Sequence, residues 1–116
     1  MVLKRLILGL NGTFALVNGS FMLVASEVWF ASVAASTGPF NLHLVKDVGA
    51  AFVISSLALF ACLWRPAFWP AALVGAAFLS AHGLIHLANM IEGHAHHPVR
   101  DLFVLIIPAL LSLWAA

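Results

Sequence analysis

The sequence contains very few charged residues. Only 8% of its 116 residues are Asp, Glu, Lys or Arg, whereas soluble domains carry about 25%. With 64% of the residues hydrophobic, too few polar side chains remain for a water-facing surface, and a disordered chain is excluded by the same figure. A net charge of +1 offers no basic surface, which excludes a nucleic-acid-binding protein. The single cysteine, Cys62, excludes a disulfide framework. The composition therefore indicates an integral membrane protein with one domain, residues 1–116.

The few charged residues are separated by long stretches that contain none. Four of them contain no Asp, Glu, Lys or Arg, namely residues 6–26, 48–64, 66–91 and 102–116. A bilayer core about 30 Å thick needs about 20 helical residues, and only helices or closed barrels satisfy the backbone in lipid. The alternating pattern of a barrel is missing. We therefore predict an all-α transmembrane four-helix bundle, with helices at about residues 4–26, 43–64, 68–90 and 99–115.

The longest connection lies between the first two predicted helices. Residues 28–36 are apolar enough to form a short helix along the membrane interface. Thr37-Gly38-Pro39 then predicts a turn, and Asn41 is placed to cap the second helix. In the fourth helix, Pro108 predicts a kink.

The basic residues predict an orientation. Lys4, Arg5 and Arg65 fall on one side of the bundle, and Lys46 and Arg100 fall on the other. The three-to-two bias favours both termini in the cytoplasm. The first helix resembles a signal peptide, but its apolar run, residues 6–26, exceeds the usual core of about 7–15 residues, so we expect it to be retained.

All acidic residues and all histidines map to the side opposite the termini. These are Glu27, Asp47, Glu92, Asp101, His43, His82, His86, His94, His96 and His97. Ionisable groups inside a bilayer are costly and usually face the bundle interior or a watery cavity. The asymmetry therefore predicts a functional site in the outer half of the bundle.

Two helices carry pairs of these residues at a spacing of four. His82 and His86 share one helix face, and His43 and Asp47 share a face of the second helix. His86 and Asp47 each lie about 10 Å outward from the midpoint of their helices. We expect both pairs to turn toward one outward-opening pocket, where the supporting residues are Asn18, Lys46, Asn89, Arg100 and Asp101.

Three hypotheses fit this pattern. In the first, His43, Asp47, His82 and His86 bind a metal ion, or His43, His82 and His86 bind haem b, in a redox-associated or metal-handling role. In the second, the pocket binds a small solute without a cofactor and couples its transport to protons. In the third, the histidines only join helices, and the protein is a non-enzymatic accessory subunit. The His-rich loop at residues 94–97 either collects a cation or is a solvated turn.

The segment from Thr37 to His43, TGPFNLH, is followed by Lys46-Asp47-Val48-Gly49. Together with the helix carrying His82 and His86, it resembles small bacterial four-helix membrane proteins of the DoxX-like group. Some DoxX-type proteins are small subunits of quinone-linked sulfur oxidoreductases, so the resemblance implies a redox-accessory role in a bacterial inner membrane. It also implies that His43, Lys46 and Asp47 matter to the family. We expect a homo-oligomer or a subunit of a larger membrane complex.

Overall fold

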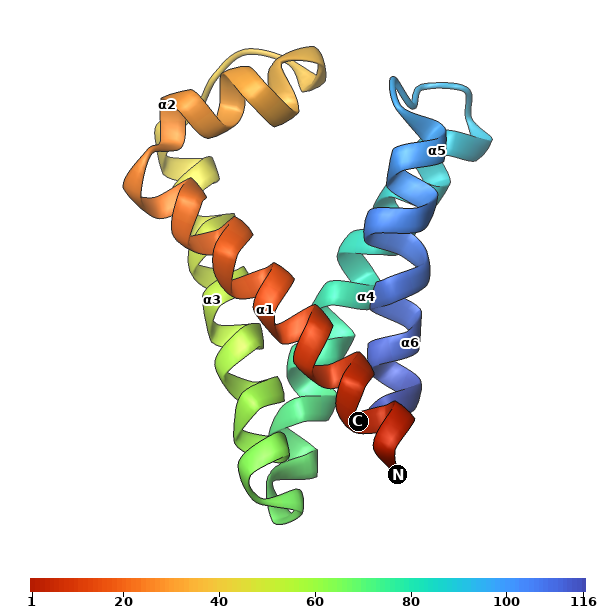
Figure 1. Ribbon diagram of the computed structural model, residues 1–116. Helices are drawn as coiled ribbons and strands as arrows, with labels where there is room; N and C mark the ends of the chain where they lie inside the picture. The colour runs from red at the N-terminus through yellow and green to blue at the C-terminus, as the bar shows by residue number, and fades with distance from the viewer.

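The computed structural model describes residues 1–116 and is an all-α four-helix bundle, as predicted (Figure 1). Its elements, in chain order, are α1 (Val2–Val24), α2 (Ser26–Trp29), the π-helical η1 (Phe30–Ala34), the 3-10 helix η2 (Ala35–Thr37), α3 (Leu42–Trp64), the 3-10 helix η3 (Pro66–Phe68), α4 (Trp69–Ile91), α5 (Pro98–Asp101), the π-helical η4 (Leu102–Ile106) and α6 (Ile107–Ala115).

Four helical stretches are long and apolar enough to cross a membrane. They are α1, α3, η3 with α4, and α5 through α6. A helix of 23 residues, the length of α1 and α3, extends about 35 Å, which covers a hydrocarbon core of about 30 Å. The predicted bounds differ from the observed ones by at most two residues. The bundle is thus that of an integral membrane protein whose apolar helices face lipid.

Helix starts follow the local sequence signals. The side chain of Asn41 accepts a hydrogen bond from the Leu44 backbone N–H at 3.0 Å, which confirms the predicted cap of α3. Pro66 and Pro70 occupy the first turns of η3 and α4, where no intrahelical N–H bond is lost. Gly38, in the predicted turn, has a φ of 135°, a conformation that favours glycine.

The connection between α1 and α3 is helical over a longer range than predicted. Ala25, with φ −133°, ends α1, and helical structure resumes at once at Ser26 and continues to Thr37 through α2, η1 and η2. Figure 1 shows this segment lying across one end of the bundle. We call this end, which also carries the loop at residues 92–97, the outer end, and the end with both termini the inner end.

Small side chains make up much of the interior, and most of the large aliphatic ones face outward. Ala15, Ala72, Ala76, Ser56 and Ser112 are fully buried, whereas most of the large aliphatic residues are exposed. This distribution is expected where lipid surrounds the bundle, because large apolar side chains gain nothing by leaving lipid and small ones allow close helix contact.

Two buried serines join helices directly. The Ser56 hydroxyl in α3 donates to the Gly12 carbonyl in α1 at 2.7 Å, and the Ser80 hydroxyl in α4 donates to the Ala109 carbonyl in α6 at 3.0 Å. Each bond satisfies a polar group that would otherwise be unpaired in an apolar interior.

The helices form two arms that diverge toward the outer end. One arm consists of α1 packed on α3, and the other of α4 packed on α5, η4 and α6. Contacts of α3 with α4 and of α1 with α6 join the arms, and near the termini Lys4 Nζ donates to the Trp114 carbonyl at 2.9 Å. Figure 1 shows the arms separating above this junction.

Glycines set the distance between α1 and α3. A Cβ added at Gly19 would lie 2.6 Å from the Gly49 carbonyl oxygen and 2.8 Å from Phe52 Cβ, and one added at Gly49 would lie 2.8 Å from Met22 Cβ. All three distances are shorter than van der Waals contact, so the two backbones pack directly against each other.

We expect Gly19→Ala to destabilise the bundle by about 1–3 kcal/mol, because the methyl group must push α1 away from α3. Reversible unfolding in mixed micelles measures this. Gly9→Ala is the matched control, since its Cβ would meet only Leu63 Cδ1 at 3.7 Å, and alanine favours a helix by about 1 kcal/mol. Equal stability of the two variants would contradict direct backbone packing at Gly19.

Candidate ligand-binding cavity

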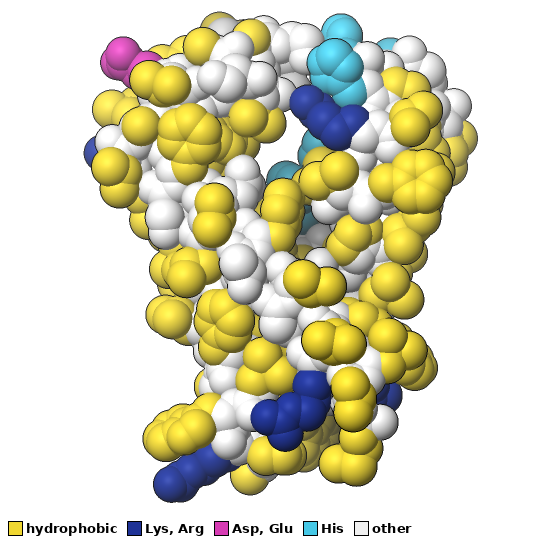
Figure 2. Space-filling model, in the orientation of Figure 1, with side chains coloured by type: hydrophobic (Ala, Val, Ile, Leu, Met, Phe, Trp, Pro, Cys, Tyr) yellow, Lys and Arg dark blue, Asp and Glu magenta, His cyan; other side chains and the backbone are white.

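A cavity of about 430 Å³ lies between the two arms toward the outer end. Figure 2 shows the corresponding hollow, with histidine side chains inside it and a basic side chain at its rim. Twelve of its 17 lining residues are hydrophobic. The volume falls in the range of about 300–1,000 Å³ that is typical of small-molecule sites, and so does the combination of apolar walls with a few polar groups.

Both arms and the segment across the outer end contribute to the wall. Phe14 comes from α1, Val48 and Phe52 come from α3, and the two π-helical segments contribute Phe30 from η1 and Val104 from η4. π-Helical turns are rare and are often found at functional sites. Here both of them border the same cavity.

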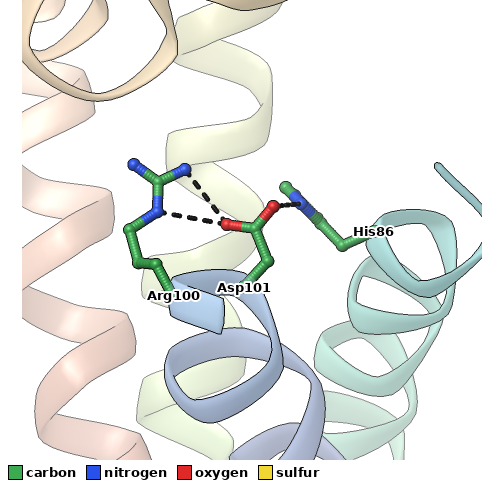
Figure 3. A network of polar contacts seen from close by, with 3 residues as sticks. All are labelled: His86, Arg100 and Asp101. Atoms are coloured by element: carbon green, nitrogen blue, oxygen red, sulfur yellow. Dashed lines mark hydrogen bonds and ion pairs between the residues drawn. The ribbon is translucent and has the colours of Figure 1, made fainter. Parts of the chain in front are cut away.

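The polar part of the wall centres on Asp101, which is 5% exposed (Figure 3). Its Oδ1 accepts bonds from Arg100 Nε at 3.1 Å and Nη2 at 3.0 Å, and its Oδ2 lies 3.1 Å from His86 Nδ1. A buried carboxylate is stable only when paired and hydrogen-bonded, and these contacts supply both. Arg100 and His86 line the cavity, and the carboxylate holds them in place.

The bond to Asp101 also determines which His86 nitrogen remains available. A carboxylate only accepts hydrogen bonds, so the proton on Nδ1 faces Asp101. In the neutral ring, Nε2 then carries a lone pair and has no partner in the chain. Since no buried side-chain nitrogen or oxygen is unpartnered in this structure, Nε2 is not buried, and His86 is one of the residues that line the cavity.

His82 lies one turn deeper than His86. Its ring centroid is 4.9 Å from that of His86 and 5.2 Å from that of Phe52, and it stacks on Phe78 at 6.3 Å. Neither ring nitrogen has a hydrogen-bond partner, and by the same argument neither is buried. His82 also borders a second cavity of about 20 Å³ next to Asn11, which is large enough for one water molecule.

Trp29 was not predicted to belong to the site. It nevertheless lines the cavity, and its Nε1 donates to Asn18 Oδ1 at 2.9 Å. The bond connects the segment across the outer end to α1. The sequence carries no signal for this pairing, because it depends on the break in the helix at Ala25.

The structure brings together only part of the predicted site. Asn18, His82, His86 and Arg100 line the cavity, with Asp101 buried behind them. The expectation that His43 and Asp47 face the same cavity is not met. They pair with each other at 3.2 Å, with side chains 89% and 64% exposed, because α3 buries the face that carries Val45, Gly49 and Phe52.

The other predicted residues lie outside the cavity as well. Lys46 and Asn89 are exposed, and in the His-rich loop His94 Nδ1 lies 3.4 Å from Glu92 Oε2. No group of three or more His, Cys, Asp or Glu side chains is arranged to hold a metal ion. Metal binding by His43, Asp47, His82 and His86 remains a prediction.

Comparison of the chain with models of protein families, with curated proteins and with solved structures gives no match. The resemblance to DoxX-like proteins therefore rests on the sequence segments quoted above. The cavity itself is the feature of this protein that points to a function.

We expect Asp101→Asn to lower the free energy of unfolding by about 1–3 kcal/mol, because it removes the charge that pairs with Arg100 in a buried position. Asp47→Asn is the control, since an exposed carboxylate contributes little, about 0.5 kcal/mol or less. Unfolding in mixed micelles compares the two. A loss for Asp47→Asn as large as that for Asp101→Asn would contradict a special role for the buried carboxylate.

Proposed function

We propose that the protein binds a small, largely apolar solute in the cavity between its arms and acts as a solute-binding or carrier protein of the membrane. The observation that carries the proposal is that His82 and His86, whose unpartnered ring nitrogens are not buried, line a mostly apolar cavity. Protein interiors normally contain few voids larger than a water molecule. A hollow of about 430 Å³ with a few polar groups in its wall therefore supports a binding role.

The position of the cavity supports entry from the bilayer. The outer parts of the two arms do not pack closely against each other, and the residues at the separation include Phe14 and Val104, which are 37% and 42% exposed. In a membrane these side chains face lipid. An apolar solute dissolved in the bilayer can therefore reach the cavity without crossing water.

Trp29 provides a local reporter of occupancy. The other tryptophans, Trp64, Trp69 and Trp114, are exposed at the inner end, so their replacement by Phe leaves one fluorophore at the cavity wall. In this background, reconstituted into lipid nanodiscs, we expect 1-bromooctane to quench Trp29 saturably, because bromine quenches an indole ring that it contacts. The quenching titration is the measurement.

A pair of variants on α3 separates binding from general partitioning into lipid. Val48→Phe fills the cavity, whereas Ile54→Phe adds the same ring on a lipid-facing position that is 67% exposed. Saturable quenching should be lost in the first variant and kept in the second. Linear, unsaturable quenching that is identical in both would overturn the proposed function.

Haem ligation is a second candidate function, favoured by one observation. Metal-binding histidines usually donate their other N–H to a carboxylate, and Asp101 accepts this bond from His86. His86 Nε2 would hold the haem iron, which supplies redox chemistry when bound. A lone metal ion fits less well, because the cavity offers two imidazoles where three or four protein ligands are usual.

Titration with hemin tests this candidate. If His86 holds the haem iron, the Soret band of added hemin should shift and sharpen up to one equivalent, and His86→Ala should lose this change. Asp101→Asn should weaken binding about 10–100-fold through the lost orientation of the ring. His43→Ala, at an exposed position, should bind like the wild type. A Soret band unchanged in His86→Ala would exclude this ligand.

We also propose that the inner end faces the cytoplasm of a bacterial cell. The three basic residues at that end, Lys4, Arg5 and Arg65, have no acidic residue near them in the sequence, and cytoplasmic loops are enriched in such residues. With this orientation, the cavity lies in the outer leaflet.

A further inference from the structure

The polar wall of the cavity offers a defined set of hydrogen-bonding atoms. His86 contributes the Nε2 lone pair, since its Nδ1–H is directed at Asp101. His82 contributes at least one N–H donor, because an imidazole always carries one. The two ring centroids are 4.9 Å apart and tilted by 58°. With hydrogen bonds of about 2.7–3.2 Å, one oxygen atom between the rings can reach a nitrogen of each.

The charges in the wall are already balanced. The negative charge of Asp101 is matched by Arg100, whose Nε and Nη2 both point at the carboxylate. None of the other acidic residues lines the cavity, so an ammonium group would find no partner there. A carboxylate would have to compete with Asp101 for Arg100. An ammonium or a carboxylate group of a ligand would also lose its hydration on entering the cavity. Only an unpaired opposite charge in the wall offsets that cost.

Among uncharged groups, a hydroxyl fits both histidines. It donates one bond, which His86 Nε2 can accept, and it accepts bonds, which the His82 N–H can donate. An ether or ketone oxygen only accepts, so it would leave the His86 lone pair without a partner after displacing water from it. The rest of the wall, including Phe14, Phe52 and Val104, is suited to a hydrocarbon chain.

We infer that the solute is an uncharged amphiphile with a hydroxyl group on an apolar chain, and that the hydroxyl is held between His82 and His86. This inference rests on the proposed function of the cavity. It specifies the chemical class of the ligand: an alcohol drawn from the membrane, and neither a fatty acid nor an amine.

The experiment compares four probes that have the same chain and different ends. They are 8-bromo-1-octanol, its methyl ether, 8-bromooctanoate and 1-bromooctane, titrated against the single-tryptophan protein in nanodiscs at matched concentrations in the lipid. We expect the alcohol to bind about tenfold more tightly than the ether, since the ether leaves one buried acceptor unpaired. The carboxylate should bind more weakly than the alcohol.

The outcomes separate this inference from the function on which it depends. Equal affinity for the alcohol and the ether, or tightest binding of the carboxylate, would overturn the hydroxyl assignment while leaving the cavity a binding site. Failure of all four probes to quench saturably would overturn the proposed function itself. As a test of the assigned residues, His86→Ala should bring the alcohol-to-ether ratio close to one, and His43→Ala should keep the wild-type ratio.

Discussion

Close contact between small residues determines where this bundle is filled and where it is hollow. Gly19 and Gly49 bring the backbones of α1 and α3 together, and Gly75 in α4 would place a Cβ only 2.9 Å from the Ser55 carbonyl of α3. On the outer side of the contact between Gly75 and Ser55, the large side chains of Phe52 in α3 and Phe78 in α4 lie between the arms. The arms therefore diverge toward the outer end, and the cavity follows from their divergence.

The polar site lies where this divergence leaves room. Asp101 is buried at the start of the fourth membrane-crossing stretch, and its bond to His86 joins α5 to α4 within one arm, beside the cavity. An ionised group at this depth is costly in lipid, so its retention inside the bundle is consistent with a function in binding. The pairing neutralises the wall and leaves hydrogen bonding, without net charge, as the means of selecting a ligand.

The four membrane-crossing helices were predictable because uncharged runs of this length have one stable structure in lipid. The Asn41 cap was predictable for a different reason, because it joins residues that are close in sequence. The rotation of α3 was not, because it depends on Gly49 and Phe52 facing other helices, and this turned His43 away from the cavity. The π-helical η4, which follows Asp101 directly, was not predictable either, because the sequence has no clear signal for it.

The π-helical turn in η4 amounts to one residue more than an α-helix would use over the same length. Deleting a single residue between Leu102 and Ile106 would restore a continuous α-helix. The wide turn absorbs the extra residue, so Asp101 keeps nearly the rotation about the helix axis, relative to α6, that it would have in a continuous α-helix one residue shorter. The same extra residue in a helix that stayed α-helical throughout would rotate Asp101 by about 100° and carry its carboxylate away from His86. The π-helical turn thus allows this short segment to differ in length by one residue without loss of the site.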